Sequence, residues 1–240
     1  NFLVQHINAF LKNNDFACDL SLRMEQETST RFLDWIDHVV LPENGVSAEA
    51  VKDAGFQEMD HCEAPAGMRV FMHPKTMLFP VLLSQKNIVE IALKPERLDH
   101  FTQVFDRNIS MEGHRYGPYW KSIVSIQDGY ILSAVERRGF CGFLVPEKTN
   151  DIQEYRKALE IFFCRQRHFE NSGEGMDATQ KLVETMCKKL SPSRVTDAFF
   201  RAERAYWERR NRAGQIQKAR QDSLGMGWGN HDHHTYRSSR

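Results

Sequence analysis

Short apolar runs alternate with turn residues along the first part of the chain, a pattern typical of β-strands. The clearest run covers residues 35–42, where β-branched side chains precede a Pro-Glu-Asn-Gly turn. Ser47 then fits the N-cap of a short helix that ends at Ala54. Further apolar runs predict strands over residues 68–73, 77–84 and 87–93. The predicted order of elements up to residue 93 is therefore β-α-β-β-β.

The β pattern continues after one helix. Residues 95–105 begin with Pro in the first turn and place their large apolar side chains on one face, which predicts a helix. Strands are predicted over residues 119–126 and 130–136, on either side of an Asp-Gly hairpin signal. A third strand is expected over residues 139–146.

Apolar residues recur at helical spacing towards both ends of the chain. This spacing predicts one helix over the first dozen residues and others around 152–163, 178–190 and 191–221. The sequence therefore predicts an α+β fold in three regions. They are a helical lead-in over 1–34, a β-rich domain over 35–146 and a helical extension over 147–240.

Composition and charge narrow the class of protein. Hydrophobic residues make up 41% of the 240 residues, enough for a sizeable core, and 32 basic residues balance 32 acidic ones. No net charge attracts the chain to nucleic acid or an anionic membrane, and no apolar run is long enough to span a bilayer, so we expect a soluble, cytoplasmic protein. The scattered cysteines are expected to be reduced and buried: Cys18, Cys62, Cys141, Cys164 and Cys187.

Two polar residues interrupt apolar strands. His38 should share a strand face with Ile36 and Val40, so its imidazole should be buried and need a partner. It is either a core histidine bonded to a carboxylate or carbonyl, or a metal ligand or catalytic base. Glu90 stands between two β-branched residues, where an unpaired carboxylate is costly to bury, unless the strand lies at a wet sheet edge.

The motifs I-D-H-V-V-L-P, D-A-G-F and V-E-I-A-L together resemble one module of the vicinal-oxygen-chelate superfamily, which includes glyoxalases and extradiol dioxygenases. The resemblance covers residues 35–93. It implies a cupped mixed sheet of βαβββ-like units and a divalent metal (Fe, Zn, Ni or Mn) bound by His38 and Glu90. Glu136 resembles the carboxylate that a second module contributes. The chain departs from the family pattern because it lacks a clear second unit with its own histidine and carries a helical extension.

The last sixteen residues, G-M-G-W-G-N-H-D-H-H-T-Y-R-S-S-R, concentrate chemically active groups. Three glycines permit close backbone approach, and Trp228 offers an apolar anchor, so we expect this segment to pack back on the sheet. A disordered His-rich tail is the alternative. We predict that either Glu136 or a histidine of this cluster, such as His234, completes the metal site beside His38 and Glu90. His233 would act as general acid or base, and His231, Arg237 and Arg240 would bind substrate.

These features predict a metal-dependent enzyme of the dioxygenase, lyase or isomerase type. Its substrate would be a small anionic 2-oxo or 2-hydroxy acid chelated through adjacent oxygens. One alternative is a non-catalytic protein that binds a small molecule on the same sheet. Another is a helical interaction or nucleic-acid-binding module based on the arginine-rich residues 191–221, although interleaved acidic residues favour a solvated, salt-bridged face. No membrane partner is expected, and a homodimer is compatible with the sequence.

Overall fold

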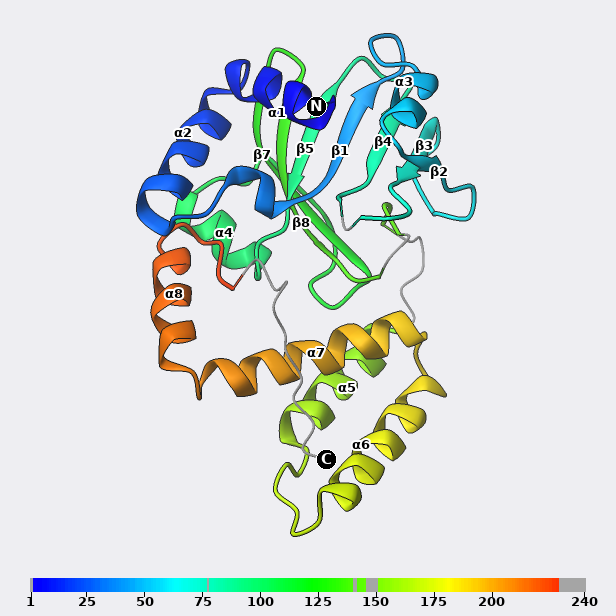
Figure 1. Ribbon diagram of the computed structural model, residues 1–240, viewed down its shortest axis with the longest axis vertical. Coiled ribbons are helices and arrows are strands. Elements are labelled where there is room, and N and C mark those ends of the chain that lie inside the picture. The colour runs from blue at the N-terminus through cyan, green and yellow to red at the C-terminus, as the bar shows by residue number, and fades with distance from the viewer. Residues whose placement is uncertain (1, 77, 140–141, 146–150, 229–240) are drawn as a thin grey trace.

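A mixed eight-stranded sheet forms the centre of the molecule (Figure 1). The computed structural model describes residues 2–76, 78–139, 142–145 and 151–228. The spatial order of the strands is β2-β3-β4-β1-β5-β8-β7-β6. Their bounds are β1 Ile36–Pro42, β2 Gln57–Glu58, β3 Met68–Met72, β4 Val81–Ser84, β5 Val89–Leu93, β6 Ser110–Gly113, β7 Tyr119–Gln127 and β8 Tyr130–Arg137. The predicted class, an α+β cupped sheet with a helical carboxy-terminal extension, is confirmed.

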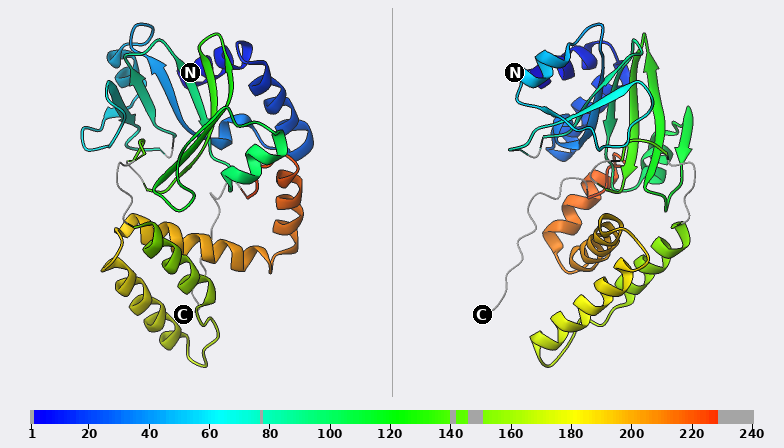
Figure 2. Two further views of the ribbon diagram at one scale, coloured as in Figure 1. Left: turned by 180° about the vertical axis from the view of Figure 1, so that it is seen from behind. Right: turned by 90° about the vertical axis from the view of Figure 1, so that its right-hand side faces the viewer.

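Four helices of the first half cover one face of the sheet (Figures 1 and 2). They are α1 Phe2–Lys12, α2 Asp15–Arg23, α3 Ala48–Asp53 and α4 Leu98–Phe105. A π-helical turn, η1 Met24–Thr28, and a 3-10 turn, η2 Phe32–Trp35, lead into β1. The apolar sides of these helices share one core with Val39, Leu41 and Ile91 of the central strands. We call this side of the sheet the helix-covered face.

Three helices of the extension have a core of their own. They are α5 Ile152–Cys164, α6 Ser172–Cys187 and α7 Pro192–Glu208, and Tyr155, Phe162 and Ala198 are fully buried among them. The last helix, α8 Arg212–Asp222, leads the chain back to the sheet, where Leu224 and Met226 enter the main core. Figure 2 shows α5–α7 standing apart from the helices that cover the sheet.

Several element boundaries differ from the prediction. The expected third strand over 139–146 is wrong within the described residues, because Gly142 forms only an isolated bridge to Glu63. The polar edge strand β6 was not predicted. The expected helix over 191–221 is two helices, because the Asn211 side chain accepts a hydrogen bond from the Gly214 amide at 2.9 Å and starts α8. The helix expected from residue 178 begins at Ser172.

The cysteines also depart from expectation. Cys18, Cys164 and Cys187 are free thiols, as predicted, but all three are exposed. Cys62 takes part in a disulfide, so the expectation that it is reduced is wrong. Among the helices in the described part of the chain, none combines the length and the apolar character needed to cross a bilayer.

Candidate active site

A β-bulge at the start of β1 sets the direction of its polar side chains. The pairing of β1 with β5 shifts between Ile36 and His38, so Ile36 packs in the helix-covered core with Val39. The prediction that Ile36 and His38 share a face is therefore wrong. His38 faces the opposite side of the sheet, with Val40. We call this side the His38 face.

The His38 imidazole is 2% exposed and held from two sides. Its Nδ1 lies 2.8 Å from Oδ2 of Asp37, and its ring meets the edge of Phe143 at a centroid distance of 5.4 Å. A carboxylate acceptor at Nδ1 favours the tautomer that carries its proton there and leaves a lone pair on Nε2. The predicted burial and the predicted carboxylate partner are confirmed. Among the described residues, no hydrogen bond joins Nε2 to a partner.

Asp37 is the centre of a buried ion-pair network. Its Oδ2 accepts a hydrogen bond from Nε of Arg137 at 2.8 Å, and Nζ of Lys94 lies 3.7 Å from its Oδ1. Burial alone would raise the pKa of Asp37, but Arg137, the hydrogen bond from His38 and Lys94 hold that pKa well below its usual value. Asp37 is therefore ionised at neutral pH and fixes the orientation of His38.

Glu90 lies on the His38 face of the neighbouring strand, opposite Val40. Its Oε1 accepts hydrogen bonds from the Ser133 hydroxyl and the Lys121 ammonium, both at 2.5 Å. Burial alone would raise the pKa of Glu90, yet Lys121 and His38 lower it below the ordinary value. Tyr119 lies close enough that Glu90 adds to the effect of burial in raising the pKa of its phenol.

The charged groups on the His38 face do not cancel. Asp37 and Glu90 supply two negative charges, while Lys94, Lys121 and Arg137 supply three positive ones. With neutral His38 the cluster carries one net positive charge. Such a site favours an incoming anion over a further cation.

Glu136 lies on the helix-covered face. It pairs with Trp120, which belongs to the main core, and its Oε1 accepts a hydrogen bond from the Leu98 amide at 2.9 Å. Its Oε2 contacts Arg138 and Arg201. Glu136 therefore caps α4, and its predicted position beside His38 and Glu90 is wrong because it points through the other side of the sheet.

The described residues do not fit a divalent metal centre by themselves. His38 and Glu90 lie on the same face of the sheet, as the resemblance implied. However, the carboxylate of Glu90 already forms an ion pair with the Lys121 ammonium. Within residues that the structure describes, no group of three His, Cys, Asp or Glu side chains could hold a metal ion. A bound metal would need a ligand from elsewhere and a displacement of Lys121.

The predicted tail residues His231, His233, His234, Arg237 and Arg240 lie outside the described residues. The segment that leads to them packs as expected. Gly225 and Gly227 have φ values of 65° and 69°, and a Cβ at Gly225 would lie 2.7 Å from the Cα of Phe101. The amide of Glu96 donates to the Met226 carbonyl, and the Trp228 amide donates to Oε2 of Glu96, each at 2.9 Å.

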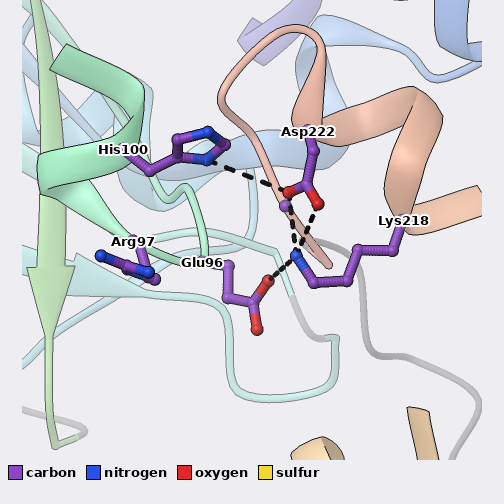
Figure 3. Close-up of a pocket in the computed structure, with 6 residues that line it drawn as sticks. Glu96, Arg97, His100, Lys218 and Asp222 are labelled. Carbon is purple, nitrogen blue, oxygen red and sulfur yellow. Dashed lines mark hydrogen bonds and ion pairs between the residues drawn. The ribbon is translucent and has the colours of Figure 1, made fainter. Parts of the chain in front are cut away.

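A cavity of about 150 Å³ lies between α4 and α8 (Figure 3). Nζ of Lys218 lies 2.8 Å from Oδ2 of Asp222 and 3.1 Å from Oε2 of Glu96, and Nδ1 of His100 lies 3.9 Å from Asp222. Two carboxylates thus neutralise the one ammonium. We interpret this cavity as part of the structural connection between α8 and the sheet.

A second cavity, of about 140 Å³, lies where β5 and β8 end and α7 crosses beneath them. We call it the junction cavity. The parallel strands β5 and β8 both end here, so the residues that follow each strand meet at one edge of the sheet. Its lining is Lys94, Pro95, Glu96, Glu136, Arg137, Arg138, Asp197, Phe200, Arg201 and Arg204.

The arginines of α7 face the protein more than solvent. Arg194 is 3% exposed, and its guanidinium donates to Asp151 and to the carbonyl oxygens of Tyr116 and Gly117. Arg201 contacts Glu136. The expected solvated, salt-bridged face therefore does not hold for the buried Arg194, whereas Arg209, Arg210 and Arg212 are exposed, as expected.

The cations of the site were not identified from the sequence. Lys121 lies in a strand that alternates polar and apolar residues, and Arg137 follows Glu136 at the end of another. A buried carboxylate such as Glu90 needs a cation nearby, so the sequence indicates that a lysine or arginine lies close to it. Which cation reaches it depends on strand register, which the sequence alone leaves open.

Comparisons with known proteins add little. No family model matches the chain, and no curated protein matches it. Among solved structures, a glyoxalase I variant from Zea mays aligns with 13% identity and a TM-score of 0.33, over 44% of this chain and 44% of that one. The chain thus matches less than half of that protein's length. Similarity at this level does not assign the chain to a family.

Proposed function

We propose that the His38 face is the active site of an enzyme that acts on a small anionic 2-oxo or 2-hydroxy acid. The observation that supports this proposal is the burial of Asp37, His38 and Glu90 in one polar cluster with unequal charge. Burying so many ionisable groups contributes little to stability compared with apolar packing, and such clusters are frequent at functional sites.

His38 is the residue we place at the reacting atoms. Its Nε2 lone pair can accept a proton from a carbon or hydroxyl next to the substrate carbonyl, while Asp37 stabilises the resulting imidazolium. Lys121 is 17% exposed through its side chain, more than Glu90 beside it, so an approaching carboxylate meets this ammonium first. Glu90, itself held by the Ser133 hydroxyl, keeps the ammonium in place.

A divalent metal stays a prediction that rests on the resemblance. His38 and Glu90 would hold it, and a third ligand would have to come from His231, His233 or His234. A metal bound there would act as a Lewis acid on the substrate oxygens. Elemental analysis of the full chain, made without an affinity tag of histidines, tests this point separately. Metal that stays bound after both His38→Ala and Glu90→Gln would rule out this position.

Binding of 2-oxoglutarate and 2-hydroxyglutarate, measured by titration calorimetry, tests the proposed function. Glutarate is the control ligand because it lacks the 2-oxygen. We expect His38→Asn to weaken binding of the oxo acid about tenfold or more, because a charged or hydrogen-bonded contact is lost. The exposed His168→Asn should bind as the unchanged chain does. Equal binding of glutarate and the two acids would contradict the proposal.

The alternative function is binding of the same acid without catalysis, since the same buried cluster could bind it. Proton NMR of the acid during incubation with the protein separates the two functions. An enzyme should exchange or consume the hydrogen atoms next to the oxo group faster than His38→Asn does. Tight binding with no difference between the two proteins would favour the binding protein.

A further inference from the structure

The junction cavity has an excess of positive charge. Five cationic side chains line it, Lys94, Arg137, Arg138, Arg201 and Arg204, against three carboxylates, Glu96, Glu136 and Asp197. Asp37, just outside the lining, pairs with Lys94 and Arg137, so one positive charge remains unbalanced among these groups. Because the cavity lies between a sheet edge and a helix, water screens these charges less than it would on an open surface.

Arg204 is the least satisfied of these cations. It forms no hydrogen bond and no ion pair with any residue in the described part of the chain, and its Nε is buried without an acceptor. Burial lowers the pKa of its guanidinium, with Glu96 providing the largest opposing effect. Leaving a buried donor without a partner destabilises a fold, and more so if the donor is charged, so we infer that an acceptor binds here.

Arg138 provides a second donor towards the same cavity. It is 5% exposed, and its two terminal nitrogens donate to Glu136 and to the Gly117 carbonyl. Its Nε has no hydrogen-bond acceptor among the described residues, and the nearest carboxylate oxygen, on Asp197, is 3.6 Å away. Arg138 is thus fixed in position, and its Nε–H group has no hydrogen-bond acceptor among the described residues.

The helix α7 places its groups on one face. Asp197, Phe200, Arg201 and Arg204 recur at spacings of three and four residues, so they project from the same side of the helix into the cavity. Their backbone is rigid, which lowers the entropy lost when an anion is bound.

We propose that the junction cavity binds a compact dianion, inorganic phosphate or the phosphate group of a small ester, between Arg138 and Arg204. The two unused Nε–H groups match the several acceptor oxygens of a phosphate, and the excess of positive charge favours an anion. The volume of about 140 Å³ is similar to that of engineered cavities of about 150 Å³ that hold benzene. This inference does not depend on the proposed function.

Titration calorimetry with sodium phosphate at pH 7.5 tests the site in the full chain. Nitrate at matched ionic strength and malonate are the comparison anions. We expect saturable phosphate binding that Arg204→Gln weakens about ten- to a hundredfold, because a charge-assisted hydrogen bond is lost. Arg209→Gln is the matched control, since Arg209 caps the carboxyl end of the same helix and is exposed. Binding of glucose 6-phosphate, compared with free phosphate, tells whether the cavity accepts an ester.

Three results would overturn the inference. They are phosphate binding no tighter than nitrate, equal effects of Arg204→Gln and Arg209→Gln, and tighter binding of malonate than of phosphate. Folding is checked by thermal denaturation without anions, where Arg204→Gln should melt at or above the temperature of the unchanged chain because it removes an unpaired charge. His38→Asn should leave phosphate binding unchanged, so failure of this inference and failure of the proposed function are distinguishable.

Discussion

At the scale of single residues, the ion pair of Glu90 and Lys121 shows why a buried charge depends on its partner. Lys121 Nζ is 2.5 Å from Oε1 of Glu90, and Glu90 is 4% exposed. The pair need not stabilise the fold more than two apolar residues would, because both ions lost their hydration. Removing only one partner destabilises the fold, since the other charge then stays buried without a counter-ion.

Lys121→Met should therefore lower the free energy of unfolding by about 3–5 kcal/mol. The double variant Lys121→Met/Glu90→Gln should recover much of that loss, because no charge is left uncompensated. Urea denaturation of the two single variants, the double variant and the unchanged chain gives the coupling energy. Lys157→Met is the control, since its ion pair with Glu154 is largely exposed and should contribute little to the free energy of unfolding. Additive effects at Lys121 and Glu90 would contradict the pairing.

The sequence predicted the two central residues of the site but not their partners. His38 and Glu90 stand out because each interrupts an apolar strand, and burial of each follows from its neighbours. Arg137 and Lys121 are remote in the sequence and reach the site through the order and register of β5, β8 and β7. The bulge that turns Asp37 and His38 to the same network breaks the alternation on which the sequence argument relied.

At the scale of elements, Asn14 connects the first two helices to the β7–β8 hairpin. Its side chain caps α2 by accepting from the Ala17 amide at 3.0 Å, and it also accepts from the Ser125 hydroxyl and donates to the Tyr130 carbonyl, each at 3.2 Å. It is fully buried. One amide thus satisfies polar groups of a helix and of two strands.

We expect Asn14→Ala to lower the free energy of unfolding by roughly 2–4 kcal/mol, because a helix cap is lost and buried partners are left unsatisfied. The neighbouring Asn13→Ala is the control. Asn13 is exposed, and its side chain donates only to the Ala9 carbonyl among the described residues. The change in the free energy of unfolding should therefore stay within about 0.5 kcal/mol. Chemical denaturation followed by tryptophan fluorescence measures both. A loss at Asn14 no larger than at Asn13 would show that the amide is not a connecting group.

Elements with a strong local signal were predicted well. The hairpin between β7 and β8 has left-handed backbone at Asp128 and Gly129, as the Asp-Gly pair indicates, and the Ser47 hydroxyl accepts from the Ala50 amide as an N-cap should. Where the local signal is weak, tertiary contacts decide. The polar edge strand β6 forms because β7 offers it a free edge, and the helical periodicity continues across Asn211 although the chain turns there.

At the scale of the whole molecule, arginines, together with the packing of Tyr116, connect the sheet with the helices α5–α7. The main core and the core of the three helices are separate clusters. Between them, Arg194 of α7 donates to carbonyl oxygens of the loop before β7, and Arg138 after β8 approaches Asp197.

Stability of the whole chain should fall in acid because of two carboxylates at the His38 face, Asp37 and Glu90. The folded-state pKa values of Asp37 and Glu90 lie below their ordinary values of 3.8 and 4.5. A group with a lowered pKa adds stability that is fully present above the unfolded pKa and is lost as pH falls towards the folded one. Below about pH 4.5, the unfolded chain binds protons that the folded chain does not, so the free energy of unfolding should drop by about 1.4 kcal/mol per pH unit for each such group.

Urea denaturation between pH 3 and pH 7 measures this dependence. We expect little contribution from Asp37 and Glu90 between pH 7 and pH 5, and a steep fall below pH 4.5. Other carboxylates also titrate in this range, so the double variant Lys121→Met/Glu90→Gln isolates the contribution of Glu90. Its slope below pH 4.5 should be smaller than that of the unchanged chain by about the contribution of one group. Identical slopes would mean that Glu90 titrates alike in the folded and unfolded chains, and that the buried ion pair does not hold its proton off.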